Sequence, residues 1–400
     1  MKQVVTLISC LFLSSFMCAQ VPCSLDNSFD TDGKLVSDGN RMGEHILVQA
    51  DGKIIIGCNP FSGSGVSIKR LNVNGSLDNT FGTAGSYTTG ISHASRMCFY
   101  DGNIYVSGTY STGSNTYPAV TALTGNGTVL NSFNGGMVKM LTSLYTCEGK
   151  TMDGSGNMYL TGAKELDEMY VAKLTNAGSL DNSFDGDGIT TLNTGNTNHW
   201  YTMLDIVVDG NNKILVTGKK YKATNGSSIV PFQNLVVARF LSNGTLDNSF
   251  AASGLAFFNS ASGHYEEGMR IHVLSGNKYI ITGSTYDNVD YDYMVLKLQN
   301  NGTTDNSFGI NGWKLRDLDG TNEMEYSLNS AILQDGRILV TGNQGSGDTV
   351  YFCMLMLNQD GSDNNMFAPS GVFKHIFNVN NISSSSGLAL DSSGKIVLGG

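Results

Sequence analysis

The sequence predicts an all-β fold made of a repeated unit, and three observations carry this prediction. The chain of 400 residues contains 49 Gly and 5 Pro, and only 14% of its residues are charged. Short runs with alternating apolar residues are frequent, and no long run has the apolar spacing of an amphipathic helix. Two short motifs return along the chain in a constant order. Such an array shares one continuous core, so we expect a single domain.

The first motif is SLDNSF at residues 24–29. Complete or degraded copies of it end at seven phenylalanines: Phe29, Phe81, Phe133, Phe184, Phe250, Phe308 and Phe367. Successive copies lie about 51 to about 66 residues apart, at the long end of the repeat lengths of propeller blades. We interpret these phenylalanines as structural anchors that pack as wedges between neighbouring repeats.

Five copies of this motif carry an Asp-Asn pair before the phenylalanine, beginning at Asp26, Asp78, Asp181, Asp247 and Asp305. Short polar side chains cap turns by binding nearby backbone amides, which explains the repetition of these residues without a ligand. The alternative is that the pairs ring one face of the molecule as a cation site.

The second motif is a β-branched run that follows an Asp-Gly turn, first seen as KIIIG at residues 53–57. Its counterparts end at Gly108, Gly162, Gly218, Gly283, Gly342 and Gly400. In the first repeat, residues 34–37, 46–48, 53–57 and 66–71 form four expected strands separated by turn residues. Seven units of four antiparallel strands predict a seven-bladed β-propeller of four-stranded antiparallel blades. A single-axis solenoid is the alternative, although its repeats are usually shorter.

The last blade is expected to be incomplete, because the sequence stops directly after the third strand of the seventh unit. Residues 21–23 precede the first copy of the first motif and could dock there, but they include a proline that cannot donate to a sheet. We therefore expect an exposed or poorly paired edge beside residues 395–398.

The order of strands predicts which residues line the central channel. Taking the run after each phenylalanine as the first strand places residues 34–38, 86–89, 138–141, 189–192, 255–258, 313–317 and 372–376 in the channel. The Asp-Gly turns and the LDNSF segments, read as crossings between blades, then lie on one face. The loops that differ most between repeats lie on the opposite face, where specificity is most readily added.

The first 19 residues have the layout of a secretory signal peptide: Lys2, an uncharged apolar stretch, and a cleavage position after Ala19. The expected domains are therefore a signal peptide at residues 1–19 and a C-terminally truncated propeller at residues 20–400. A lipid anchor on Cys18 is the alternative. The apolar stretch is too short to predict a transmembrane segment. We expect a protein that is secreted or displayed at the cell surface.

Five cysteines remain after this segment, at Cys23, Cys58, Cys98, Cys147 and Cys353. Their spacing matches no metal site, so we expect mainly small buried side chains, with a disulfide between neighbouring repeats as the alternative. The net charge of −10 argues against nucleic acid as a partner, which requires clustered Lys and Arg. No cofactor is predicted, and a monomer is expected.

The GSLDNSFG segments, the DGKIxVxG strand and the VxRL strand together resemble the delta-60 repeat of secreted bacterial β-propeller proteins. The resemblance covers nearly the whole chain after the predicted signal peptide. The family pattern has Gly after the phenylalanine, as at Gly82 and Gly309, whereas Asp30, Asp185 and Ala251 replace it in other copies. The resemblance implies no catalytic residues. It also implies that similar proteins often continue into a sorting domain of the type IX secretion kind, which this sequence does not include.

Aromatic residues mixed with acids in the loops between the expected third and fourth strands are the candidate partner-binding residues. They are Tyr110, Tyr117, Tyr221, Phe232, Tyr286, Asp287, Asp290, Tyr291 and Tyr351. Tyrosine offers a large, stiff contact area with a polar end, which suits protein or glycan partners. The alternative is that several of these residues simply begin the next strand.

No catalytic or metal-binding residues are assigned from the sequence. The six histidines are scattered, and the expected channel strands bring no pair of carboxylates together. The loops at residues 30–33 and 185–188 alternate Asp with Gly and could bind calcium, but neither has an EF-hand pattern. The sequence favours an exported, non-catalytic binding or adhesion scaffold for a protein or glycan. The alternative is an extracellular hydrolase or lyase that acts on a polysaccharide through the central funnel.

Overall fold

The protein is described from a computed structural model that covers residues 3–9, 23–37, 41–60, 65–165, 168–193, 199–222, 230–251, 253–261, 264–318, 320–346, 349–376 and 386–400. Within these residues the regular structure is β-strand, apart from the 3₁₀ turns η1 (Asn134–Gly136) and η2 (Pro369–Gly371). None of the described helical segments is long and apolar enough to cross a membrane.

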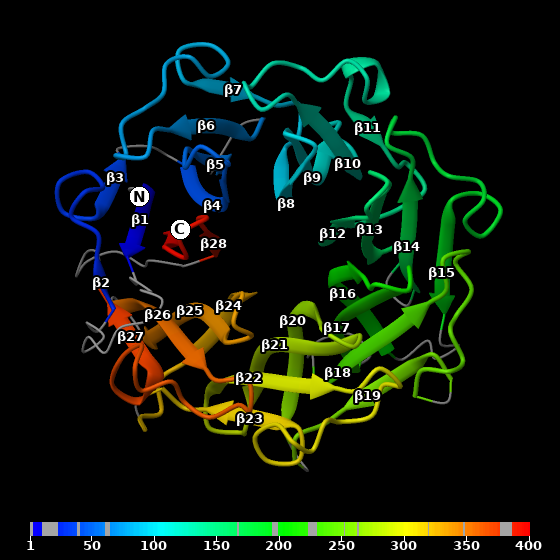
Figure 1. Ribbon diagram of the computed structural model, residues 1–400. Coiled ribbons are helices and arrows are strands. Elements are labelled where there is room, and N and C mark those ends of the chain that lie inside the picture. The colour runs from blue at the N-terminus through cyan, green and yellow to red at the C-terminus, as the bar shows by residue number, and fades with distance from the viewer. Residues whose placement is uncertain are drawn as a thin grey trace.

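Six four-stranded antiparallel blades surround a central channel (Figure 1). Each blade is contiguous in the chain, and its strands run in order from the channel to the rim. The blades are blade 1, β4 (Arg41–Val48), β5 (Ile54–Pro60), β6 (Ser67–Leu71) and β7 (Ser86–Thr88); blade 2, β8 (His93–Tyr100), β9 (Asn103–Ser111), β10 (Thr116–Leu123) and β11 (Lys139–Met140); blade 3, β12 (Gly149–Met152), β13 (Met158–Ala163), β14 (Glu168–Leu174) and β15 (Ile189–Asn193); blade 4, β16 (His199–Val208), β17 (Ile214–Lys222), β18 (Val230–Phe240) and β19 (Leu255–Phe258); blade 5, β20 (Tyr265–Leu274), β21 (Lys278–Tyr286), β22 (Tyr291–Leu298) and β23 (Trp313–Arg316); and blade 6, β24 (Glu325–Ile332), β25 (Ile338–Ser346), β26 (Thr349–Leu357) and β27 (Val372–His375).

A five-stranded sheet, here called the closing sheet, lies between blade 6 and blade 1 (Figure 1). It combines three strands from residues 3–37 with two strands from residues 387–399. Strand β29 (Ile396–Gly399) pairs with β28 (Gly387–Leu390) on one side and with β1 (Gln3–Ser9) on the other. Strand β1 also pairs with β2 (Ser24–Leu25) and β3 (Lys34–Ser37).

The prediction of seven four-stranded blades with an incomplete last one is therefore wrong. The structure has six four-stranded blades, and the seventh copy of the second motif contributes to the closing sheet together with the first copy of the first motif. The motifs count chain segments, whereas a blade is defined by the strands that pair, and here these strands come from distant parts of the sequence. The expected unpaired edge at residues 395–398 is also wrong, because β29 has a neighbour on each side. Strand β1 lies within residues 1–19, whose role as a signal peptide stays a prediction.

The predicted assignment of strands to the channel is wrong as well. The strands that follow each phenylalanine, from β7 to β27, lie at the rim, and the strands that line the channel are β4, β8, β12, β16, β20, β24 and β28 (Figure 1). LDNSF segments consequently join the third and fourth strands of one blade rather than crossing between blades. The four strands follow one another in the same order along the whole chain. The order of the motifs therefore does not reveal which of the four strands is the innermost strand of a blade.

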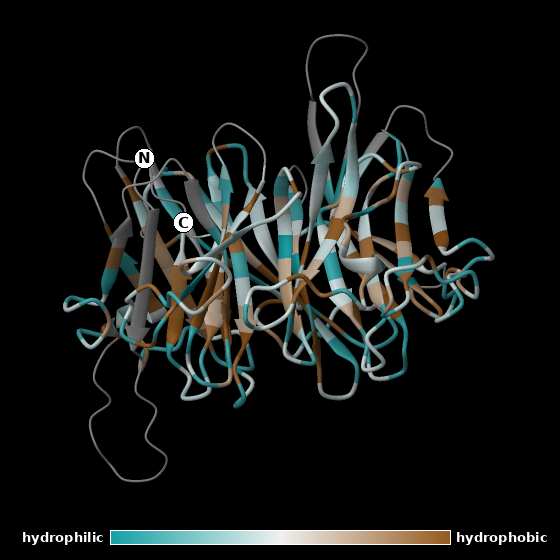
Figure 2. Cartoon of the chain, turned by 90° about the horizontal axis from the view of Figure 1, so that it is seen from above, coloured by the Kyte–Doolittle hydropathy of each residue, from teal (hydrophilic) through white to brown (hydrophobic). Residues whose placement is uncertain are grey.

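The hydrophobic core is divided among the interfaces between neighbouring sheets. Phe81 of blade 1, for example, is fully buried in a cluster with Ile104 and Val106 of blade 2. Figure 2 shows the ring edge-on, with turns projecting from both faces of a band of strands in which hydrophobic residues are frequent. The described cysteines form no disulfide with one another, and all except Cys98 are buried.

Each interface from the closing sheet to blade 6 carries the same contact between a phenylalanine and a glycine. A Cβ atom on Gly127 would lie 2.7 Å from the ring of Phe81, and one on Gly302 would lie 2.8 Å from the ring of Phe250. Both glycines have positive φ and belong to the turn before the next LDNSF segment. The corresponding pairs are Phe29 with Gly75, Phe133 with Gly178, Phe184 with Gly244, and Phe308 with Gly361. The ring of one blade therefore lies on the turn of the next.

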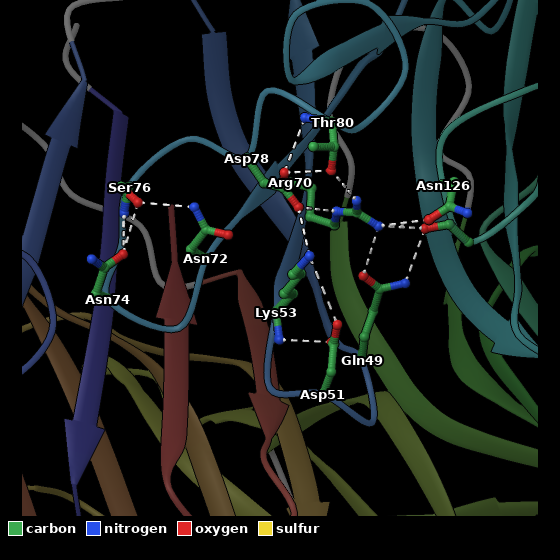
Figure 3. A network of polar contacts seen from close by, with 11 residues as sticks. Gln49, Asp51, Lys53, Arg70, Asn72, Asn74, Ser76, Asp78, Thr80 and Asn126 are labelled. Atoms are coloured by element: carbon green, nitrogen blue, oxygen red, sulfur yellow. Dashed lines mark hydrogen bonds and ion pairs between the residues drawn. The ribbon is translucent and has the colours of Figure 1, made fainter.

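The Asp of the LDNSF segment organises a buried polar network, shown for blade 1 in Figure 3. One carboxylate oxygen of Asp78 accepts hydrogen bonds from the backbone N–H and hydroxyl of Thr80, at 3.0 and 2.6 Å. The other oxygen binds Arg70 Nε at 2.8 Å and Lys53 Nζ at 2.9 Å. These bonds and the two cations hold the pKa of Asp78 well below its usual range. The Asp-Asn segments thus act as turn caps, and their carboxylates are neutralised by the protein's own cations.

Candidate functional site

A row of four tyrosine rings crosses from blade 5 to blade 6 on the face opposite the Asp-Gly turns. Tyr265 begins β20, and its cross-strand neighbour Tyr286 ends β21, so that the two rings stack with centroids 5.7 Å apart. Tyr286 in turn pairs with Tyr291 at the start of β22, at 5.0 Å between rings. Tyr291 reaches Tyr326 of β24, at 4.8 Å. Tyr326 is 37% exposed and the other three are partly exposed, so the row is accessible from solvent.

Five carboxylates lie beside this tyrosine row and are here called the carboxylate cluster: Asp287, Asp290, Asp292, Asp317 and Glu325. Asp287 and Asp290 belong to the turn between β21 and β22, where Asp287 accepts a hydrogen bond from Val289 N–H at 2.9 Å. Asp292 follows in β22. Asp317 comes directly after β23, and Glu325 begins β24 in the next blade. The cluster therefore depends on three separate pieces of chain and spans two blades.

Burial and repulsion within the cluster change the pKa of Asp292. Burial, together with the charges of Asp290, Asp317 and Asp287, raises the pKa of Asp292 to about 7. Glu325 is fully buried, and its two oxygens accept the N–H of Leu318 at 3.0 and 2.8 Å. Burial, with a smaller contribution from Glu267 on the channel strand β20, raises the pKa of Tyr291 and Tyr326. Glu267 itself is paired with Lys219 Nζ at 2.6 Å. The row is thus an aromatic surface bordered by acids.

The structure brings four of the sequence-predicted residues, Tyr286, Asp287, Asp290 and Tyr291, into this one site. Tyr110 and Tyr117 pair with each other in blade 2, away from the site. Tyr351 lies in β26 and packs against the hydrophobic cluster between blades 5 and 6. Tyr221 and Phe232 lie in β17 and β18, but their side chains are outside the described residues.

Sequence reasoning missed Tyr265, Tyr326, Asp292, Asp317 and Glu325. Tyr265 and Tyr326 stand at the beginning of two channel strands, which the sequence prediction had not identified as such. The pairing of Tyr265 with Tyr286 also depends on the β-bulge between Gly268 and Arg270, which shifts the hairpin register by one residue. The alternation of Asp and Tyr at residues 286–293 was the available signal for the rest.

The central channel is the second polar region of the molecule. The inner strands of blades 1, 2, 4, 5 and 6 each have a β-bulge near the middle. The residues just after these bulges, His45, Arg96, Asp205, Arg270 and Asn329, line a cavity of about 220 Å³. A bulge re-aims a side chain, which explains why the polar residues point inward here. The Gly of the second repeat motif lies opposite the bulge, and at Gly108 an added Cβ would collide with the backbone of His93.

Residues of the channel bind one another in a circuit around the ring. His45 Nε2 lies 2.9 Å from the carbonyl oxygen of Ala94 in the next blade. Arg96 donates to Leu204 O at 3.0 Å, so it reaches across to blade 4. Asp205 accepts from Ile271 N–H at 3.0 Å, and Arg270 donates to Asn329 at 3.0 Å. The circuit fixes the inner strands relative to one another.

Two histidines of the channel remain neutral at mildly acidic pH. Burial, with a contribution from neighbouring arginines, lowers the pKa of His45 to about 3 and that of His272 to about 4. In the unfolded chain both would titrate near 6.5, so only the unfolded state gains protons between about pH 6.5 and 4. The stabilisation by each neutral ring is therefore complete above pH 6.5 and is lost as the pH falls through this window.

We expect the free energy of unfolding to fall more steeply with acidification in the parent than in His45→Gln. The difference in slope between pH 6.5 and 4 should approach, at most, about 1.4 kcal/mol per pH unit. Urea denaturation at half-unit pH steps measures both slopes, and the comparison cancels the titration of all other groups. Equal slopes for the parent and His45→Gln would contradict the assignment of a depressed pKa.

One family model and several solved structures are similar to parts of this chain. The family model described as a domain of unknown function (DUF5122) beta-propeller matches residues 49–81 and 210–250. No curated protein matches the chain. Solved structures with a similar fold include an α-L-arabinofuranosidase from Clostridium thermocellum (14% identity, 67% of this chain and 91% of that chain, TM-score 0.35). They also include Sqt1 from Chaetomium thermophilum (9% identity, 88% and 76%, TM-score 0.45) and the polysaccharide lyase Uly1 (11% identity, 79% and 77%, TM-score 0.43).

These structural likenesses are too distant to carry an argument about activity. The two segments matched by the family model contain the second repeat motif and the LDNSF segment of blades 1 and 4. They support a β-propeller repeat family for this chain.

Proposed function

We propose that the protein is a non-catalytic binding scaffold that holds a glycan on its tyrosine row. The observation that carries the proposal is the continuity of the row, in which the four rings follow one another at 5.7, 5.0 and 4.8 Å across two blades. Tyrosine combines a stiff apolar face with a polar hydroxyl, which suits a ligand whose own faces are apolar and whose edges carry hydroxyls. A pyranose ring has this character.

Asp287, in the turn beside the row, supplies the polar half of such a site. Ionised carboxylates accept hydrogen bonds that are stronger than those between neutral groups, and sugar hydroxyls are suitable donors. The neighbouring carboxylates of the cluster add negative charge, which favours a neutral glycan over a polyanionic one. Glu267, on the channel strand β20, is paired with Lys219 Nζ at 2.6 Å.

Export to the cell surface or to the medium, as a monomer, is part of the same proposal. It is supported by the resemblance to delta-60 repeat proteins and by the sequence layout of residues 1–19, of which residues 3–9 form strand β1 in the closing sheet. The polysaccharide-acting enzyme considered as the alternative stays a prediction. Glu44 and Asp205 are the carboxylates that line the channel cavity, and both already accept hydrogen bonds, from Asn59 at 2.6 Å and from Ile271 at 3.0 Å.

The test is affinity electrophoresis through gels that contain neutral or acidic polysaccharides, followed by calorimetric titration with oligosaccharides of any polysaccharide that retards the protein. Tyr291→Ala and Tyr326→Ala should each weaken binding by about tenfold or more, the effect of losing a central aromatic contact. Tyr145→Ala is the matched control. Tyr145 is 60% exposed and lies outside the row, between β11 of blade 2 and β12 of blade 3.

Retardation that survives both row substitutions would overturn the placement of the site. Retardation by no polysaccharide, together with row-dependent capture of a purified surface protein, would show that the scaffold binds a protein partner instead.

A further inference from the structure

Beneath the tyrosine row, the interface between blades 5 and 6 contains buried polar atoms that have no hydrogen-bond partner. Both amide atoms of Gln344 are unpartnered, and the residue has no exposed surface. The hydroxyls of Ser327 and Tyr293 are buried and unpartnered in the same way. Each such group is costly to bury, and a native structure usually provides it with water, an ion or another ligand.

These atoms converge on Glu325. Gln344 is the cross-strand partner of Glu325, so the two side chains share one face of blade 6. Ser327 stands two residues further along β24 and therefore points to the same side. Tyr293 approaches from blade 5: its hydroxyl lies close to Gly342 of blade 6, and the charge of Glu325 contributes to its raised pKa.

The carboxylates above these groups have the spacing of a cation site. Single oxygen atoms of Asp292, Asp317 and Glu325 lie within 4.8 Å of one another. Two oxygens bound to one calcium ion at about 2.4 Å are separated by no more than about twice that distance. Among the described residues, Asp292 has no hydrogen bond or ion pair through its carboxylate, so its oxygens are available.

We propose that Asp292, Asp317 and Glu325 bind a calcium ion, with the side-chain oxygen of Gln344 as a neutral ligand at the buried end. Calcium accepts six to eight oxygen ligands in a flexible arrangement, and solvent can supply the remainder at the exposed end. Magnesium demands a small and nearly ideal octahedron, which three carboxylates from different strands suit less well. The ligands come from both blades, so the ion would tie blade 5 to blade 6.

This site differs from the two Asp-Gly loops that the sequence indicated. Asp187 of the second loop is exposed, and its carboxylate caps its own turn by accepting a hydrogen bond from Ile189 N–H at 2.8 Å. The calcium ligands Asp292, Asp317 and Glu325 are also distinct from Asp287, the carboxylate assigned to the glycan, so ion binding and glycan binding can be tested separately.

Terbium luminescence tests the proposal directly. Terbium replaces calcium at oxygen sites and emits when a nearby tyrosine is excited, so Tyr291 and Tyr326 serve as built-in antennae. Protein stripped with a chelator should give a saturable signal with one terbium ion per chain, and added calcium should displace it. Calcium should also raise the melting temperature, and chelator should reverse the rise.

Two variants separate ion binding from a general loss of structure. Asp292→Asn should abolish both the terbium signal and the calcium-dependent rise, yet melt no earlier than the parent in chelator, because it removes a repelling charge. Gln344→Met preserves the volume of the side chain and should weaken calcium binding without abolishing it. The control Asp187→Asn should behave like the parent.

Absence of any calcium-dependent heat, luminescence or melting shift in the parent would overturn the proposal. It would also be overturned if Asp292→Asn kept the parental affinity, or if Asp187→Asn removed the binding.

Discussion

Arg239→Ala is expected to lower the free energy of unfolding by about 3–5 kcal/mol, the range for breaking a buried ion pair by removing one partner. Arg239 is 1% exposed and donates through Nε to Asp247 at 2.8 Å. Its other nitrogens bind Ser249 at 3.1 Å and Asn300, which belongs to the next blade. The guanidinium also lies over the ring of Phe250, 4.8 Å from its centroid.

The size of this effect follows from what remains after the substitution. Asp247 keeps Lys213 at 2.7 Å, but the Nε contact and the bridge to the next blade are lost in a region closed to water. Arg239→Lys should recover only part of the loss, because an ammonium group cannot reproduce the planar set of donors. Chemical denaturation measures both variants.

Lys164→Ala is the control for Arg239→Ala, since Lys164 and Glu168 form a partly exposed pair at 3.1 Å. Such pairs contribute about 0–1 kcal/mol. A loss below about 1 kcal/mol for Arg239→Ala would contradict the view that the network supports the fold.

Phe250→Ala is expected to cost about 3–5 kcal/mol, as is typical for a large ring deleted from a core. The ring is fully buried and packs against Leu215 of its own blade and Tyr279 of the next. Urea unfolding followed by intrinsic fluorescence measures the loss. Phe257→Ala, at a rim position that is 43% exposed, should cost clearly less.

Glycine substitutions isolate the contact between blades. Gly302 and Gly276 both have positive φ, but an added Cβ meets the Phe250 ring at 2.8 Å only in the first case and open space in the second. Gly276→Ala should therefore cost the backbone strain alone, about 1–2 kcal/mol. Gly302→Ala should add an overpacking cost of about 1–3 kcal/mol.

A double-mutant cycle completes the test. In a Phe250→Ala background, Gly302→Ala should cost no more than Gly276→Ala does, because the opposing ring is gone. Equal losses for the two glycine variants in the parent would show that the ring and the turn do not press on each other.

The sequence was informative wherever a physical requirement is repeated in every unit. The all-β class follows from alternation and turn chemistry, and Asp78 and Asp247 can be interpreted as turn caps because their side chains are short and precede a turn. The phenylalanines could be interpreted as wedges for the same reason, since an apolar ring at a constant position must be buried at a constant place.

Features that depend on how the units close could not be read in this way. Strand β29 finds its partner about 390 residues away in β1, and no local pattern encodes such a pairing. The channel strands were misassigned because Lys34 and Ile46 both begin plausible strands, and periodicity does not say which is innermost. Tyr265 and Tyr326 were missed as a consequence, since only the inner position brings them to Tyr286 and Tyr291.

The contact of each phenylalanine with the following turn has a direction, from one blade to the next and never back. In symmetric assemblies such a head-to-tail contact is called heterologous, and it closes into a ring only when the rotation between units divides the full circle. The contact requires only that a phenylalanine ring packs on a glycine of the next blade, and it does not by itself fix the angle between the two blades. The number of blades therefore depends on the angle between neighbouring blades, which is set by the packing of Ile104, Val106 and their counterparts. The repeat motif marks each interface in the sequence but does not set this angle.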